Sequence, residues 1–188
     1  FCTIEPNTGV VAVPDERLDK LAELASSAKL IPTSITFVDI AGLVKGASKG
    51  EGLGNQFLGH IRNVDALIHV VRCFEDENIT HVDGSVSPKR DAEVINMELI
   101  FADLESVERR IERSSRAAKS GDKKLKAEIE LLEEAKKTLE AGKALRTIED
   151  EENALGKLGF LTTKPLLYLA NVSEEDLSNP DSNQHLAE

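Results

Sequence analysis

The sequence is poor in the residues on which several classes of protein depend. In 188 residues it has no tryptophan, one tyrosine and two cysteines, and its apolar stretches stay well short of the roughly 18 residues that span a bilayer. A membrane-spanning protein is therefore not expected. Cys2 and Cys73 lack metal-ligand spacing and do not indicate a disulfide framework. We expect a globular protein of the reducing cytoplasm, with no membrane partner.

Positive charge is also scarce. Lysine and arginine together number 23 against 34 aspartates and glutamates, so the formal net charge is −11 at pH 7. This balance argues against a protein that coats nucleic acid over its whole surface, and we expect no DNA partner. The distribution of charge still matters, because a local basic cluster can bind phosphate groups on an acidic protein.

A short apolar stretch followed by an aspartate and a glycine is the most informative local pattern. Residues 34–43 predict a buried β-strand that ends at Asp39, with Gly42 three positions later. In nucleotide hydrolases such a carboxylate holds Mg²⁺ through water, and the glycine amide approaches the terminal phosphate unobstructed by a Cβ atom. The same pattern occurs in ordinary turns, so both interpretations are open at this point.

The segment that follows this turn is rich in glycine. Residues 44–54 contain four glycines and show no apolar periodicity. Because glycine loses the most conformational entropy on ordering, such a segment suits an element that orders with one ligand and relaxes with another. A flexible surface linker is the alternative.

The other elements are predicted from hydrophobic periodicity. Strands are expected at 9–13, 66–72 and 164–171, and helices near 15–25 and at 55–63. We interpret the chain as an α/β protein, in which ligands bind beyond the carboxyl ends of the strands. Asp39 and Asn171, each at a strand end, are therefore expected at the same edge of the sheet.

Residues 88–158, which we call the arm, have a different pattern. Apolar residues there repeat at alternating spacings of three and four, at Met97, Ile100, Leu104, Val107, Ile111, Leu125, Ile129, Leu132 and Leu139. This repeat predicts an antiparallel coiled-coil hairpin whose first helix has some thirty residues and a length of about 45 Å. Gly121 is expected to end that helix, and Asp122 to cap the next one.

The far end of the predicted hairpin is basic. Residues 109–126 contain two acidic and eight basic residues, and the eight form what we call the basic tip: Arg109, Arg110, Arg113, Arg116, Lys119, Lys123, Lys124 and Lys126. Contact with the phosphate backbone of RNA is one interpretation, by shape rather than by base stacking because no aromatic residue is interleaved. A solvated helix flank is the alternative.

A polar motif follows the last predicted strand. Asn171 has an amide that can both donate and accept, as recognition of a purine edge requires, and Glu174 lies three positions later. The spacing Asn-x-x-Glu is also typical of a helix N-terminal cap. Its position one strand beyond the arm favours the purine interpretation.

Four stretches together resemble one family. They are Phe1-Cys-Thr-Ile-Glu-Pro-Asn7, the segment from Phe37 to Asn55, His69-Val-Val-Arg-Cys-Phe74 and Asn171-Val-Ser-Glu174. Over essentially its whole length the chain is similar to the Obg-like ATPases of the YchF type. The arm supports this resemblance mainly by its position.

The resemblance implies a P-loop nucleotide hydrolase with a doubly wound sheet, an inserted coiled-coil arm, a C-terminal TGS domain and association with ribosomes. Thr3 and Asp39 match residues that hold Mg²⁺, Asp39 through water, and Gly42 matches the second switch. Leu43 is similar to the hydrophobic residue that this group carries where Ras-like enzymes have a water-orienting glutamine. His81 is then a candidate to position the attacking water, with a surface-loop histidine as the alternative.

The resemblance also implies that Asn171, Val172 and Glu174 recognise the base. GTP-specific relatives carry Asn-Lys-x-Asp, in which the aspartate accepts two hydrogen bonds from guanine. In this chain Val172 removes the lysine stem and Glu174 displaces the carboxylate. ATP is therefore the expected nucleotide, GTP is expected to bind less well, and the ribosome with its RNA is the expected macromolecular partner.

Two parts of the family pattern are missing from these 188 residues. They are the Gly-x-x-x-x-Gly-Lys-Ser/Thr phosphate loop and the TGS domain. We therefore expect a fragment, divided into a first nucleotide-binding part at 1–87, the arm at 88–158 and a second nucleotide-binding part at 159–188. By itself it is expected neither to bind ATP tightly nor to hydrolyse it, and its incomplete sheet is expected to need a partner for solubility.

Two functions therefore remain open from the sequence. The first is an ATP-hydrolysing switch that acts in translation at the ribosome. The second is a coiled-coil adaptor for RNA or protein, in which the nucleotide-binding fold serves as a scaffold.

Overall fold

The computed structural model describes residues 7–40, 53–76, 78–79, 81, 84–117, 123–150 and 153–187. The chain divides into two compact units, Phe1–Gly42 and Leu43–Glu188. The described residues contain two separate two-stranded sheets, one in each unit. Helices and strands together confirm a mixed α/β protein, while the doubly wound sheet stays a prediction.

The first unit is a two-stranded ribbon with one helix. Strand β1 (Asn7–Ala12) pairs antiparallel with β2 (Ser34–Asp39), and Asn7 lies opposite Asp39. Between them lies α1 (Glu16–Leu24), whose N-terminus is capped where Asp15 accepts a hydrogen bond from the Arg17 backbone amide. These elements confirm the strands and the helix predicted for this part of the chain.

The prediction that residues 34–39 form a buried strand is wrong for this unit. Phe37 on β2 is 46% exposed, and Val10 on β1 is 69% exposed. The apolar residues Leu21 and Leu24 of α1 are exposed as well, so they do not cover the ribbon. A two-stranded ribbon has two faces. Because the nine-residue helix α1 covers neither face, the apolar residues of the ribbon are not buried in a core.

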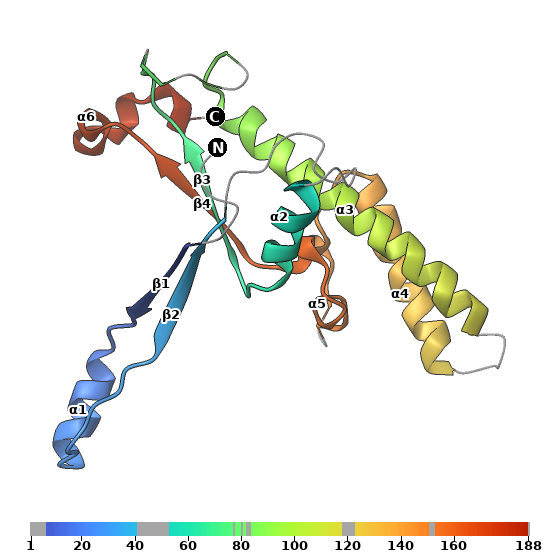
Figure 1. Cartoon of the computed structure of the whole chain (residues 1–188), viewed down its shortest axis with the longest axis horizontal. Helices are drawn as coiled ribbons and strands as arrows, with labels where there is room; N and C mark the ends of the chain where they lie inside the picture. Colours follow the sequence, from blue (N-terminus) through green and yellow to red (C-terminus); the bar gives the residue numbers. More distant parts are fainter. Residues whose placement is uncertain are drawn as a thin grey trace. The chain divides into compact units, whose positions relative to one another are not determined.

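The second unit contains a parallel pair of strands. Helix α2 (Leu53–Arg62) precedes β3 (Leu67–Arg72), which pairs with β4 (Leu166–Asn171). The two strands run parallel (Figure 1). Their register places Arg72 opposite Asn171. Because parallel strands need a long crossover connection, everything between β3 and β4 must leave the pair and return to it.

Most of that connection is helical. Helix α3 (Pro88–Ala117) has 30 residues, as predicted, and α4 (Lys123–Glu140) runs back alongside it (Figure 1). Two cross-helix contacts fix the antiparallel direction: Ser114 Oγ donates to Glu128 at 3.0 Å, and Lys136 Nζ lies 2.9 Å from Glu108. The predicted roles of Gly121 and Asp122 fall outside the described residues, and the coiled-coil packing stays a prediction.

Seven of the nine predicted apolar positions of the hairpin belong to the core of this unit, and the other two, Leu125 and Ile129, lie outside it and are half-buried. Ile100, Val107, Leu132 and Leu139 are buried in one cluster, and Met97, Leu104 and Ile111 pack against it. Three residues from beyond the hairpin complete the cluster, namely Leu145, Leu155 and Phe160. The hairpin therefore packs against later parts of the chain.

A buried carboxylate fixes that packing. Asp103 of α3 is 1% exposed and accepts hydrogen bonds from the backbone amides of Leu161 (2.8 Å) and Thr162 (2.7 Å). The Thr162 hydroxyl donates to the same carboxylate at 2.7 Å and accepts from the Leu145 amide at 3.1 Å. Burial raises the pKa of Asp103, and the hydrogen bonds from Leu161 and Thr162 oppose that rise.

The segments after α4 are short. A 3₁₀ turn at Leu145–Thr147, helix α5 (Ala154–Lys157) and a second 3₁₀ turn at Leu161–Thr163 lead into β4. After β4 come α6 (Glu174–Ser178) and two further 3₁₀ turns, Pro180–Ser182 and Gln184–Leu186. Among the described residues, none of the helices has both the length and the apolar character that crossing a lipid bilayer requires.

We expect Asp103→Ala to lower the free energy of unfolding by about 3 kcal/mol, because it leaves two buried amides and a hydroxyl without their acceptor. Glu105→Ala is the matched control on the same helix. Its carboxylate is exposed and forms an ion pair with Arg109, so its loss should cost no more than about 0.5 kcal/mol. Urea unfolding measures both, and equal losses would contradict the anchoring role of Asp103.

Candidate functional site

The carboxyl ends of β3 and β4 bring polar groups together. Arg72 and Asn171 are the last residues of their strands and lie opposite each other. Beyond them, the Cys73 amide donates to the Asn171 carbonyl at 2.7 Å, and the Asn183 side chain donates to the Cys73 carbonyl at 2.8 Å. This edge, at which nucleotides bind in open α/β proteins, is therefore held by a backbone hydrogen bond between the ends of the two strands and by a side chain from the C-terminal turns.

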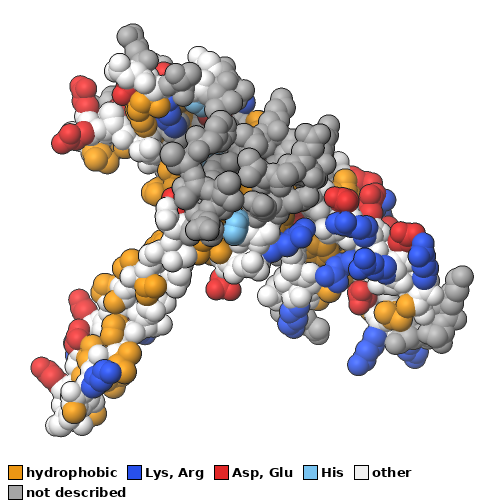
Figure 2. Space-filling model, viewed as in Figure 1, with side chains coloured by type: hydrophobic (Ala, Val, Ile, Leu, Met, Phe, Trp, Pro, Cys, Tyr) orange, Lys and Arg blue, Asp and Glu red, His pale blue; other side chains and the backbone are white. Residues whose placement is uncertain are grey.

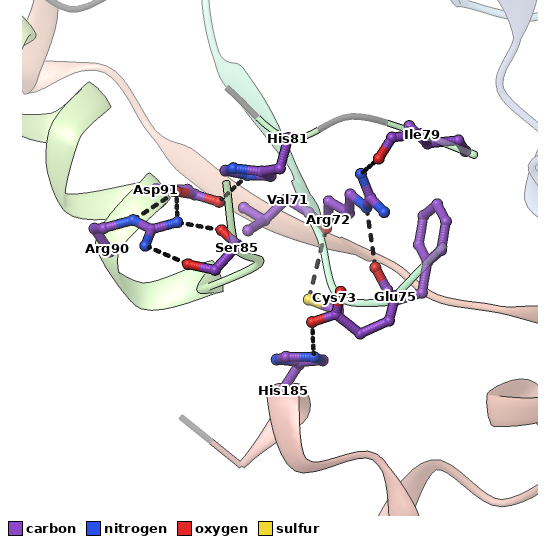
Figure 3. Close-up of polar contacts among 11 residues, drawn as sticks. Val71, Arg72, Cys73, Glu75, Ile79, His81, Ser85, Arg90, Asp91 and His185 are labelled. Carbon is purple, nitrogen blue, oxygen red and sulfur yellow. Dashed lines mark hydrogen bonds and ion pairs between the residues drawn. The ribbon is translucent and has the colours of Figure 1, made fainter. Parts of the chain in front are cut away.

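Arg72 organises the chain that follows β3. Its Nε donates to the Phe74 carbonyl at 2.9 Å, and its Nη1 donates to the Ile79 carbonyl at 3.0 Å (Figure 3). A longer contact of 3.3 Å reaches the Asp76 carbonyl, and the guanidinium lies over the Phe74 ring. One side chain thus satisfies three carbonyls of a single loop, beside an open depression of about 500 Å³ that His81 also lines.

His81 lies against the start of the arm. Its Nε2 atom is 2.9 Å from Oδ2 of Asp91 in the first turn of α3, and the two side chains are 16% and 22% exposed (Figure 3). The other oxygen of Asp91 contacts Arg90 at 3.2 Å. His81 is therefore a paired side chain with little exposure, and its role in hydrolysis stays a prediction.

The predicted base-recognition residues lie just beyond β4. Asn171 is exposed at the strand end, Val172 is half-buried, and Glu174 is the exposed first residue of α6. The cap of α6 is formed by Ser173, whose hydroxyl accepts from the Asp176 amide at 3.2 Å while Asp176 accepts from Ser173. The alternative that Asn171 and Glu174 form a helix cap is thus wrong, because a capping box two residues later performs that function.

The metal-binding prediction is only partly within the described residues. Asp39 is the exposed last residue of β2 in the first unit, whereas Thr3, Gly42 and Leu43 fall outside the described residues. In the described ranges no group of three or more His, Cys, Asp or Glu side chains could hold a metal ion. An exposed single carboxylate does fit Mg²⁺, which keeps several waters and binds through one or two carboxylates plus phosphates.

The shared edge predicted for Asp39 and Asn171 stays a prediction. Asp39 belongs to the first unit, and Asn171 and His81 belong to the second. Within the second unit, Asn171 and His81 are both connected to Arg72, one through the strand pairing and the other through the loop that Arg72 organises.

The residues of the basic tip have different surroundings. Arg109 and Arg116 form ion pairs with Glu105 and Glu112 on the same helix. Arg110 donates to the Leu158 carbonyl at 2.8 Å and lies over the Phe160 ring, so it packs within the protein. Exposed positions are Arg113, Lys123, Lys124 and Lys126, and Lys119 falls outside the described residues.

Figure 2 shows lysine and arginine side chains gathered on the hairpin, with acidic side chains among them. Ion pairs with neighbours reduce the charge that such a surface presents, so the basic tip presents less net charge than its sequence suggests. Its exposed members still have flexible side chains that reach into water.

Comparison with known proteins identifies the family. A family model described as "50S ribosome-binding GTPase" matches residues 1–102. The chain belongs to this family. The resemblance to the YchF type is also confirmed, because the chain is 54% identical over 190 residues to "Ribosome-binding ATPase YchF" of Bacillus subtilis and 56% identical over 182 residues to that of Escherichia coli O157:H7.

These matches cover 100% and 95% of this chain but 52% and 50% of the relatives. The chain thus spans about half the length of the curated relatives it matches. A solved structure of the Schizosaccharomyces pombe YchF GTPase is similar with a TM-score of 0.77 and 41% identity, covering 98% of this chain and 51% of that one.

Sequence reasoning missed two residues that organise this region. The sequence places Arg72 at the end of a predicted strand and within a family motif, and Asp91 in a long predicted helix, and it assigns neither residue a role. The available signal for Arg72 was its position directly before a loop, where a guanidinium can satisfy carbonyls. Asp91 lies ten residues from His81 with a loop between them, and no local pattern predicts that contact.

A half-buried histidine on β3 is expected to make the stability of this unit depend on pH. His69 lies opposite Tyr168 on β4, and the ring centroids are 5.6 Å apart. Its Nδ1 atom is buried and has no hydrogen-bond partner within the described part of the chain. Burial lowers the pKa of His69 below its ordinary value of 6.5, and the charge of Asp91 opposes that effect.

We expect acidification to destabilise the protein through His69. Because its pKa is lower in the folded state, its contribution is fully present above the ordinary value of 6.5 and is lost as the pH falls through the folded value. Unfolding free energies measured from pH 7.5 down to pH 5 should therefore fall less in His69→Phe than in the wild type. His60→Gln, on α2, is the control, and a pH profile unchanged in His69→Phe would refute the assignment.

Proposed function

We propose that these residues are part of a ribosome-associated P-loop nucleotide hydrolase, which binds and hydrolyses ATP, and GTP less well, as a translation-linked switch. The observation that carries the proposal is the exposed Asn171 amide at the carboxyl end of a parallel strand, with the helix cap supplied by other residues. Membership of a ribosome-binding GTPase family and the names of the relatives support it.

In this proposal three groups of residues contact different parts of the Mg²⁺-bound nucleotide: the base, the Mg²⁺ ion and the phosphates. Asn171, Val172 and Glu174 contact the base, and the missing aspartate of the GTP-specific motif makes adenine acceptable. Asp39, through water, and Thr3 hold Mg²⁺, which neutralises charge on the phosphates when bound. The phosphate loop is supplied by the whole protein, so these 188 residues alone are inactive.

The second switch contains Gly42 and Leu43. The glycine amide donates to the terminal phosphate, and the leucine excludes water where related enzymes place a glutamine. His81 then orients the attacking water. The loop that Arg72 organises holds His81 near the nucleotide. Hydrolysis removes the terminal phosphate that the second switch contacts and so changes the conformation of the switch.

We further propose the predicted three-part organisation, with nucleotide-binding parts at 1–87 and 159–188 and an inserted coiled-coil arm at 88–158. The pairing of β3 with β4 around the helical hairpin supports it. The exposed members of the basic tip contact ribosomal RNA through its phosphates, which is consistent with a cytoplasmic protein. Arg110 is more important for packing than for RNA.

The whole protein carrying Asp39→Ala or His81→Ala should lose at least about 100-fold in kcat for ATP, because each removes a group that acts at the reacting phosphate. The double variant Arg113→Ala, Lys126→Ala should hydrolyse ATP normally and cosediment less with ribosomes. Lys20→Ala with Lys29→Ala removes the same charge from exposed positions of the first unit and is the control.

Normal hydrolysis in both the Asp39 and His81 variants would contradict the roles proposed for these two residues, whereas a wild-type whole protein that hydrolyses neither ATP nor GTP would contradict the hydrolase proposal and favour the adaptor. Unchanged ribosome sedimentation in the Arg113 and Lys126 variant would show that the basic tip is a solvated flank. Both outcomes are read in the same two assays, steady-state ATP hydrolysis and cosedimentation at a fixed salt concentration.

A further inference from the structure

We propose that Asp91 is a positioning residue that restrains His81 until the arm moves. The inference rests on the proposed function, in which His81 orients the attacking water, and it adds a means by which a partner on the arm controls hydrolysis. The contact that carries it is the 2.9 Å pair between His81 Nε2 and Asp91 Oδ2.

The contact occupies the nitrogen that hydrolysis needs. Nε2 is the ring nitrogen farther from the histidine backbone, so it reaches farther than Nδ1 toward a water beyond the loop. While Nε2 is hydrogen bonded to the carboxylate, it is not available to a water molecule. Both side chains are largely buried, so solvent screens the pair less than it screens a surface ion pair.

Asp91 is held in place from its other side. Arg90 contacts Oδ1 of Asp91 at 3.2 Å, and the same guanidinium donates to the hydroxyl and the carbonyl oxygen of Ser85 (Figure 3). Each oxygen of the carboxylate thus has its own partner. Asp91 also lies in the first turn of α3, where the helix dipole favours a negative charge.

The approach to His81 along the chain is fixed by a different residue. Arg72 holds the carbonyls of Phe74 and Ile79, and Arg72 itself lies opposite Asn171 in the strand pairing. The loop is thereby attached to the sheet, whereas the imidazole is attached to the arm. Relative movement of sheet and arm would therefore act on the pair between His81 and Asp91.

The helix that carries Asp91 is well suited to transmit such a movement. Asp91 and Arg113 belong to the same uninterrupted α3, and about 33 Å of helix separates them at 1.5 Å per residue. Between them, Asp103 is fixed to Leu161 and Thr162. A load on the basic tip therefore tilts the helix about Asp103 and displaces its first turn, which separates Asp91 from His81.

The test is steady-state ATP hydrolysis by the whole protein without ribosomes. Asp91→Ala should raise kcat about fivefold with KM for ATP changed less than about twofold, because a larger fraction of the protein has His81 released. Asp91→Asn, which keeps the shape but weakens the pair, should give a smaller rise. Glu93→Ala is the control. It removes the same charge from an exposed position two residues after Asp91 on the same helix, and it should leave kcat unchanged.

A double variant shows whether Asp91 acts through His81. Combined with His81→Ala, the Asp91→Ala substitution should give no increase, and activity should stay at the level of His81→Ala alone. A merely structural role for Asp91 would lower activity in either background and would not depend on His81.

The outcomes separate this inference from the proposed function. A wild-type whole protein that hydrolyses neither ATP nor GTP would overturn both. Wild-type hydrolysis with kcat unchanged or lowered in Asp91→Ala would overturn the inference alone, as would an increase that persists without His81. If Asp91→Ala does not fold, kcat of Asp91→Asn decides, and a value at or below the wild type overturns the inference.

Discussion

The parallel pairing of β3 with β4 is the constraint on which the rest of this structure depends. It sets Arg72 beside Asn171, so the loop that leads to His81 and the motif that follows β4 begin at the same edge. It also requires that the chain between the two strands return to a fixed position beside β3, and the antiparallel hairpin makes this return possible. Fold and candidate site are thus two consequences of the same ladder of hydrogen bonds.

The hairpin is joined to this ladder through polar as well as apolar contacts. The apolar cluster around Val107 and Leu132 packs α3 against α4, but apolar contact is non-directional and would tolerate sliding of α3. Asp103 removes that freedom, because its carboxylate accepts from two successive amides and a hydroxyl of the turn before β4. The position of α3 is therefore coupled to the strand that ends at Asn171.

Local patterns in the sequence predicted the elements well. The alternating three- and four-residue spacing is a property of neighbouring residues, and it identified both helices of the hairpin and several of the residues that they bury, such as Val107 and Leu132. Contacts between distant residues have no such signal. Asp103 reads as a solvent-facing carboxylate because its partners are 58 and 59 residues away, and Asp91 is remote from His81 for the same reason. Around Asn171 the sequence indicated, as an alternative, a cap formed by Asn171 and Glu174, whereas in the structure Ser173 and Asp176 form the cap.

The central claim is that the exposed amide at the end of β4 recognises the purine of a nucleotide. Its most direct test is the affinity of the whole protein for ATP and GTP, in the wild type and in Asn171→Ala. The account predicts tighter binding of ATP than of GTP and a loss of about tenfold in ATP affinity on substitution, the cost of an unmade hydrogen bond. Equal ATP affinity of the wild type and Asn171→Ala would contradict it.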